Sequence, residues 1–182
     1  MLLNELFAFF GQASACGAVL DHSIGELFKN VGIKTQPAAQ ALANIAMHSK
    51  DASKKTNLLN DMISKIKQPG NEVAASLTLG ELGKLMDLSK VANIIDLVSS
   101  FFKAADESIR TAASICLGNI SVGNPEFFLE KVFKLVDATE HHQKYLFLNT
   151  IREIILNNPM CLNLFISKLL PMLLEQSKNE DE

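Results

Sequence analysis

The stretch ESIRTAASICLGNISVG, residues 107–123, predicts a buried helix and sets the pattern for the rest of the chain. Asp106 precedes it and can accept hydrogen bonds from the first free backbone N–H groups. Gly118 lies inside the helix, where glycine costs about 1 kcal/mol relative to alanine. We therefore expect another helix to pack closely at Gly118, and Gly123 to mark the end of the helix. The apolar residues recur at intervals of three and four, which is typical of a helix buried along one broad stripe; they are Ile109, Ala112, Ala113, Cys116, Leu117 and Ile120.

The same pattern is repeated along the chain. The segment AASLTLGELG at 74–83 aligns with AASICLGNIS at 112–121, an offset of 38 residues. Weaker copies are PAAQALANIA at 37–46 and YLFLNTIREI at 145–154. A period near 38 carried by pairs of helices is typical of a helical solenoid of the HEAT or armadillo kind. The sequence therefore predicts an all-α, right-handed α-solenoid of about four to five HEAT (armadillo-type) repeats.

The apolar spacing predicts that all 182 residues form one array of repeats. The predicted repeats are 1–50, with an irregular insertion at 17–35, then 51–87, 90–123, 124–158 and a half repeat at 159–178. The first repeat is expected to begin with an apolar helix. This segment is not expected to be a signal peptide, because a signal peptide carries Lys or Arg before its apolar run and this sequence has none there. A solenoid normally ends in a polar cap, so an array that stops on half a repeat leads us to expect a fragment of a longer protein.

Composition excludes several classes of function. Charged residues make up 20% of the chain and the net charge is −3, so no broad basic surface is available for nucleic acid. The apolar segment at 160–176 is not expected to span a membrane, because Lys168 and Pro171 interrupt it and a span needs about 20 apolar residues. Three cysteines without a CxxC pair suit a reducing compartment, the cytosol or nucleus.

No residue pattern indicates an active site. His141 and His142 are adjacent, so on a helix they point about 100° apart and do not face one metal ion. Asp106, Glu107 and Arg110 are expected to form structural contacts between neighbouring helices rather than an acid–base site. Nucleotide-binding, zinc-protease and serine-hydrolase motifs are absent from the sequence. We predict a non-enzymatic protein with no catalytic, metal-binding or cofactor-binding residues.

A solenoid binds partners on its concave side, which the second helix of each repeat lines. Exposed polar residues on these helices are therefore the candidates for partner binding. They are Glu81, Lys84, Arg110, Asn119, Lys144 and Arg152. The aromatic run at 127–133 is expected to be core rather than a docking groove for a partner helix.

Three segments are more specific than the apolar spacing: SLTLGELGKLMDLS at 76–89, AADESIRTAASICLGNISVGNPEFF at 104–128, and QKYLFLNTIREII at 143–155. They resemble the cullin-associated, neddylation-dissociated proteins, long HEAT-repeat regulators of cullin ubiquitin ligases. A generic HEAT protein would share the spacing but not the ISVGN turn. The resemblance covers most of the chain and departs at 37–46, where alanine replaces the family's bulkier residues.

The resemblance implies a scaffold that binds an unneddylated cullin–RING complex and promotes exchange of substrate-receptor modules. The family's adaptor-displacing hairpin is not found here, so the chain is expected to lie before it, in the C-terminal half of such a protein. A companion chain of the same parent protein is a further expected partner, and the expected location is the cytoplasm and nucleus. The alternative is a HEAT-repeat scaffold of another system, such as a nuclear transport receptor or a phosphatase scaffold.

Overall fold

The computed structural model describes residues 35–138 and 143–178, and this part of the chain consists of helices and their connections, without strands. The helices are α3 (Thr35–His48), α4 (Ala52–Lys65), α5 (Glu72–Leu85), α6 (Ile94–Ser100), η1 (Phe101–Lys103), α7 (Glu107–Gly123), α8 (Pro125–Ala138), α9 (Lys144–Asn157), η3 (Pro159–Cys161) and α10 (Leu162–Lys178). The predicted helix at 1–16 and nearly all of the predicted insertion at 17–35 lie outside the described residues.

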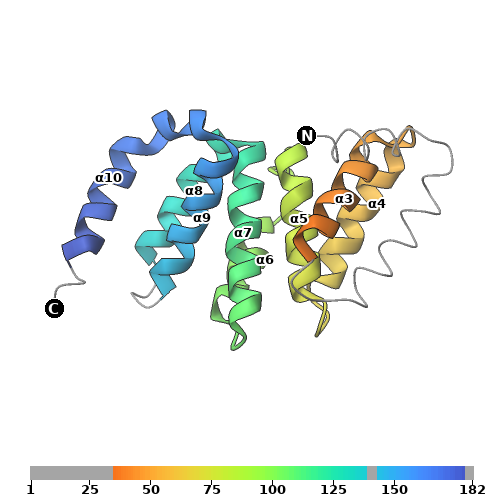
Figure 1. Cartoon of the computed structure of the whole chain (residues 1–182), viewed down its shortest axis with the longest axis horizontal. Coiled ribbons are helices and arrows are strands. Elements are labelled where there is room, and N and C mark those ends of the chain that lie inside the picture. The colour runs from red at the N-terminus through yellow and green to blue at the C-terminus, as the bar shows by residue number, and fades with distance from the viewer. Residues whose placement is uncertain (1–34, 139–142, 179–182) are drawn as a thin grey trace.

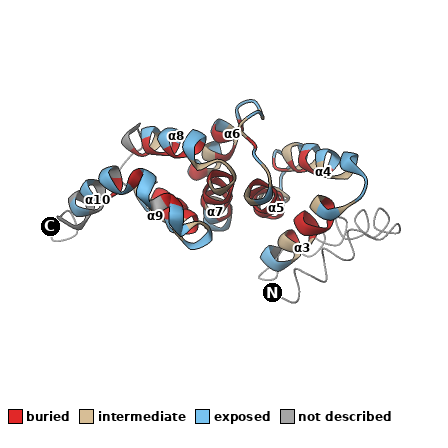
Figure 2. Ribbon diagram, turned by 90° about the horizontal axis from the view of Figure 1, so that it is seen from above, coloured by how far each residue is buried: buried red, intermediate tan, exposed pale blue. Residues whose placement is uncertain are grey.

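The helices form two layers, which Figure 1 shows from the side and Figure 2 from above. Helices α3, α5, α7 and α9 pack against one another in succession, and α4, α6 and α8 pack behind α5, α7 and α9. In Figure 2 the inner row curves, with α4, α6 and α8 on its outer side. The prediction of an all-α helical-repeat solenoid is confirmed. The predicted repeat boundaries stay a prediction, and within the described ranges no helix is long and apolar enough to cross a membrane.

Helix α7 forms as the sequence predicts. The Asp106 carboxylate accepts a hydrogen bond from the Ser108 backbone N–H at 2.7 Å, which satisfies a free donor at the start of the helix. The predicted apolar stripe is buried except for Ile109, which is half-buried. A β-carbon at Gly118 would lie 2.7 Å from the Thr150 backbone oxygen and 2.7 Å from the Glu153 β-carbon. Helix α9 therefore packs directly on the backbone of α7.

Two apolar clusters hold the layers together. The larger cluster joins α3 to α9 and contains residues from Leu42 to Phe147. The smaller one joins α8, α9 and α10 around Phe133 and Phe165, whose ring centroids are 5.7 Å apart. Because α10 contacts the array through this smaller cluster, its attachment rests on fewer buried residues than that of α5 or α7.

The structure corrects two expectations about the outer layer. A helix at 91–103 is predicted, but α6 begins only at Ile94 and gives way to a 3₁₀ turn at 101–103. Asn93, just before α6, has a left-handed backbone with φ of 56°, a conformation that asparagine tolerates better than most residues. Phe127 is 37% exposed rather than core: it lies at the edge of the buried stripe of α8, with its ring centroid 4.9 Å from that of the buried Phe128.

Candidate protein-binding surface

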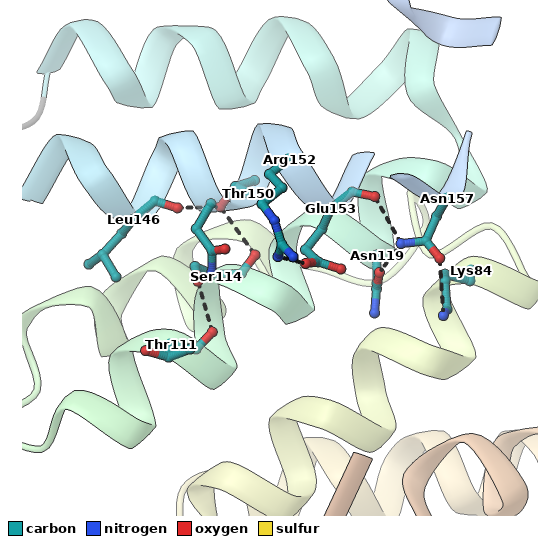
Figure 3. Close-up of polar contacts among 10 residues, drawn as sticks. Lys84, Thr111, Ser114, Asn119, Leu146, Thr150, Arg152, Glu153 and Asn157 are labelled. Atoms are coloured by element: carbon teal, nitrogen blue, oxygen red, sulfur yellow. Dashed lines mark hydrogen bonds and ion pairs between the residues drawn. The ribbon is translucent and has the colours of Figure 1, made fainter. Parts of the chain in front are cut away.

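Polar side chains form a row across α5, α7 and α9 on the inner layer, and Figure 3 shows the part of it from Ser114 to Lys84. We call it the polar row; its members are Glu81, Lys84, Ser114, Asn119, Asn149, Thr150, Arg152, Glu153 and Asn157. Glu81, Asn119 and Asn157 are separated by 38 residues each, so they occupy equivalent positions in successive repeats. The repeat itself therefore places these polar groups side by side.

One half of the polar row connects all three helices. The Lys84 ammonium lies 2.7 Å from Glu81 Oε2 and donates to Asn157 Oδ1 at 3.4 Å. The Asn157 amide donates to Asn119 Oδ1 at 3.2 Å and to the Glu153 backbone oxygen at 2.8 Å. Figure 3 shows these contacts between Lys84, Asn157 and Asn119. These contacts join α5 to α9 across the end of α7, although Lys84 and Asn157 are 73 residues apart in the sequence.

The other half of the polar row lies between α7 and α9. The Asn149 amide donates to Ser114 Oγ at 2.6 Å, and the Thr150 hydroxyl donates to the Ser114 backbone oxygen at 3.1 Å. Ser114 and Thr150 have no exposed surface. These bonds satisfy polar groups that would otherwise be costly to bury, so they fix the register of α9 on α7.

Glu81 is the unusual member of the polar row. Its residue is only 2% exposed, and its Oε1 atom has no hydrogen-bond partner among the described residues. Burial raises the pKa of this carboxyl, and the charge of Glu153 adds to the effect, while the hydrogen bond and charge of Lys84 oppose it. The polar row therefore contains a partly compensated buried carboxylate.

Cys116, whose thiol is influenced by the charge of Glu81, has none of the features of a reactive cysteine. Cys116 is fully buried, and burial raises the pKa of its thiol well above the usual range, with the Glu81 charge contributing. A neutral, inaccessible thiol is a weak nucleophile and metal ligand. Within the described ranges no group of His, Cys, Asp and Glu could hold a metal ion, and His141 and His142 lie outside those ranges.

Four of the six residues predicted for partner binding reach solvent. The Arg152 side chain is 65% exposed, while Lys84, Arg110 and Lys144 are half-buried. Arg110 donates from Nε to the Tyr145 hydroxyl at 3.1 Å and from Nη1 to the Ala104 backbone oxygen at 2.8 Å. Arg110 therefore contacts the neighbouring second helix through Tyr145, whereas the hydrogen bonds of Asp106 go to Ser108 in the first turn of its own helix.

The expected exposure of Glu81 and Asn119 is wrong. Glu81 is 2% exposed and Asn119 is 1% exposed. Both residues lie at the interface between successive second helices, because the 38-residue repeat aligns them with one another. Sequence reasoning also missed Glu153 and Asn157, although the offset of 38 from Asn119 to Asn157 would have identified the latter. A role of the six residues in partner binding stays a prediction.

The two helical layers, the curved inner row and the repeat of 38 residues define a helical-repeat protein of the HEAT type with a polar inner face. Its sequence is similar to proteins named cullin-associated NEDD8-dissociated protein 1, in agreement with the resemblance seen in the sequence. No protein-family model matches the sequence.

Three relatives carry the name cullin-associated NEDD8-dissociated protein 1. The Dictyostelium discoideum protein is 27% identical over 197 aligned residues, which cover 99% of this chain. The Arabidopsis thaliana protein is 34% identical over 59% of the chain, and the Drosophila melanogaster protein is 33% identical over 43%. The aligned parts make up 16%, 9% and 6% of these relatives respectively, so the chain spans a small share of their length.

Proposed function

We propose that this chain is a non-enzymatic protein-binding scaffold that associates with cullins. The observation that carries the proposal is the sequence relationship to proteins named for cullin association, which extends over 99% of the chain for one relative. The finer proposal is that the chain acts as a segment of a regulator that binds unneddylated cullin–RING ligase and promotes exchange of substrate-receptor modules. Such a segment would act in the cytoplasm and nucleus, alone or with a companion chain of the same parent protein.

The inner face supplies the chemistry for such binding. Lys84, Arg110, Lys144 and Arg152 lie on successive second helices, where Lys84 pairs with Glu81 and Arg152 pairs with Glu153, each at 2.7 Å. Four cations against these two carboxylates leave the set net positive, although the chain carries a net charge of −3. Charges of one sign on one face steer a partner of opposite sign and fix its orientation. The proposal therefore assigns the inner face to an acidic surface of the cullin complex.

The test is a pull-down of purified, unmodified cullin–RING complex by this chain, with neddylated complex as the comparison. Binding to the unmodified form alone supports the full proposal. Equal binding to both forms supports cullin association and overturns selectivity for the unmodified form. Binding to neither overturns the claim that this chain contacts the cullin by itself.

Substitutions locate the contact. Lys144→Ala combined with Arg152→Ala should weaken binding about fivefold to tenfold, because each removes a charge from the inner face. Lys67→Ala removes an exposed charge beyond the end of α4 and serves as the matched control. Equal affinities for both variants would exclude the inner face as the contact surface. Circular dichroism of each variant checks that the helices are intact.

A further inference from the structure

A groove on the outer layer lies between α8 and the residues that lead into α6. It encloses about 360 Å³, which is within the usual size range of sites for small molecules and single peptide side chains. Val91, Ile94 and Phe127 contribute apolar surface, and Asp96, Lys131 and Lys134 contribute charges. We call this site the outer groove. It belongs to the layer opposite the polar row, so it is independent of the proposed cullin contact.

One wall of the outer groove is a strip of α8 that faces away from the core. Phe127, Lys131 and Lys134 recur at helical spacing along this strip, while the neighbouring Phe128 and Val132 of α8 are fully buried. Phe127 retains 37% of its surface exposed. A large aromatic side chain left open at the wall of a groove is the kind of residue on which an incoming apolar side chain packs.

The two lysines are available to an anion. Lys131 Nζ lies 4.0 Å from the centroid of the Phe127 ring, and it forms no ion pair with an acidic residue in the described part of the chain. Lys134 pairs with Glu130 at 2.8 Å, but the two side chains are 73% and 63% exposed. An exposed pair of this kind contributes little free energy, so an incoming carboxylate can replace Glu130 at low cost.

The charges that line the outer groove indicate which kind of ligand it binds. The charged residues that line the outer groove are two lysines of α8 and one carboxylate, Asp96, in the first turn of α6; Glu130, which pairs with Lys134, is not among the lining residues. The lining is therefore positive on its α8 side. We propose that the outer groove binds a short acidic peptide segment of a partner protein, with an apolar side chain of the peptide packed on Phe127, Val91 and Ile94. The acidic residues of the peptide lie along α8, against Lys131 and Lys134 and away from Asp96.

The test uses the whole chain labelled with ¹⁵N and a fluorescein-labelled peptide of sequence EDELFEDE. We expect weak binding, with a Kd of about 10 to 100 µM, and amide shift changes confined to the backbone around Val91–Asp96 and Phe127–Leu135. A peptide with serines in place of Leu-Phe should bind at least about fivefold more weakly, and a peptide with lysine in place of each acidic residue should not bind.

Variants of the chain separate the two parts of the proposal. Lys131→Ala with Lys134→Ala should weaken binding of EDELFEDE about tenfold, and Phe127→Ser should weaken it by a similar factor. Lys50→Ala, at an exposed position between α3 and α4, should leave the affinity unchanged. Absence of binding at about 1 mM peptide, shift changes elsewhere, or equal affinity in the lysine double variant would each overturn the proposal.

Discussion

Gly118 sets the distance between α7 and α9. The Thr150 backbone oxygen and the Glu153 β-carbon occupy the space where any other residue would carry its β-carbon. The helix tolerates this glycine because close contact between the two helices brings Ser114, Asn149 and Thr150 within hydrogen-bond distance. One residue without a side chain thus determines how two repeats meet.

Gly118→Ala should destabilise the protein although alanine favours a helix by about 1 kcal/mol over glycine. The added β-carbon meets backbone atoms, which cannot move aside cheaply, so we expect a net loss of about 2 to 4 kcal/mol in the free energy of unfolding. Urea denaturation followed by circular dichroism measures it. Gly70→Ala is the matched control: its β-carbon meets no atom within 4 Å, and its positive φ of 87° should cost only about 1 to 2 kcal/mol. A smaller loss for Gly118→Ala than for Gly70→Ala would contradict the close-packing account.

Glu81 makes stability depend on pH in an unusual direction for a carboxylate. Burial raises its pKa in the folded state, so the folded protein binds more protons than the unfolded chain between the ordinary pKa and the raised one. Its contribution to stability is therefore greatest below the ordinary pKa and decreases as pH rises through this window. Glu81→Gln should remove that decrease, so the variant gains stability relative to wild type as pH rises from the ordinary carboxyl pKa through the raised one.

Thermal unfolding at several pH values measures this effect. Glu107→Gln removes an exposed carboxylate from the first turn of α7 and is the control for the general loss of one negative charge. The two variants should differ in the slope of stability against pH. Parallel slopes would show that Glu81 is not held in an unfavourable environment.

Individual residues were the hardest features to predict from sequence. The sequence predicts that Gly118 lies at a close helix contact, because glycine is placed inside an apolar helix, and the structure confirms this contact with α9. The burial of Glu81 and Asn119 does not follow from helical spacing within one repeat, because their neighbours are residues of the next repeat. Nothing in the sequence except the residue type indicates the left-handed conformation of Asn93. The helix was therefore predicted to begin at residue 91, whereas α6 begins at Ile94.

At the scale of elements, the same local motif, Asp-x-Ser, recurs at the start of helices. Asp51 before α4 and Asp106 before α7 each accept hydrogen bonds from the hydroxyl and the backbone N–H of the serine two residues later. Asp87 makes the same pair of bonds with Ser89 and also accepts from the Asn124 amide at 3.0 Å. The motif therefore marks the helix start at Asp51 and Asp106, whereas at Asp87 it forms a turn well before α6 begins at Ile94 and does not locate that helix.

Asp106→Ala should lower the thermal unfolding midpoint, since the first free N–H groups of α7 lose their acceptor. Asp106→Asn should retain most of the stability, because an amide oxygen can still accept. The Ser108 hydroxyl and then its backbone N–H hold the pKa of Asp106 below its usual range, so the contribution of the charged form is present above that range and is lost as pH falls through the lowered pKa. Calorimetry of the three proteins at neutral and acid pH tests this order. A difference between wild type and Asp106→Ala that does not shrink in acid would contradict it.

At the scale of the whole molecule, the array is not equally stable along its length. Each helix pair contacts only its neighbours, so local stability follows the burial at each interface. Helices α5 and α7 share the larger cluster with contacts on both sides, whereas α10 is held by Cys161, Phe165 and Leu169 against α8 and α9. Amide hydrogen exchange should therefore be slowest in α5 and α7 and faster in α10.

Phe165→Ala tests whether the end of the array opens independently. Phe165 is 1% exposed and packs on Phe133, so its removal should cost about 3 to 5 kcal/mol of local packing free energy. Because the smaller cluster lies at one end of the described array, the loss should accelerate exchange in α10 and leave the amides of α5 unchanged. Hydrogen exchange read by mass spectrometry resolves the two regions. Val98→Ala, in the larger cluster, is the contrasting variant and should accelerate exchange in α5 and α7 as well. If Phe165→Ala accelerated exchange equally everywhere, the array would unfold as one cooperative unit, and the binding surfaces on α7 and α9 would depend on the contacts of α10.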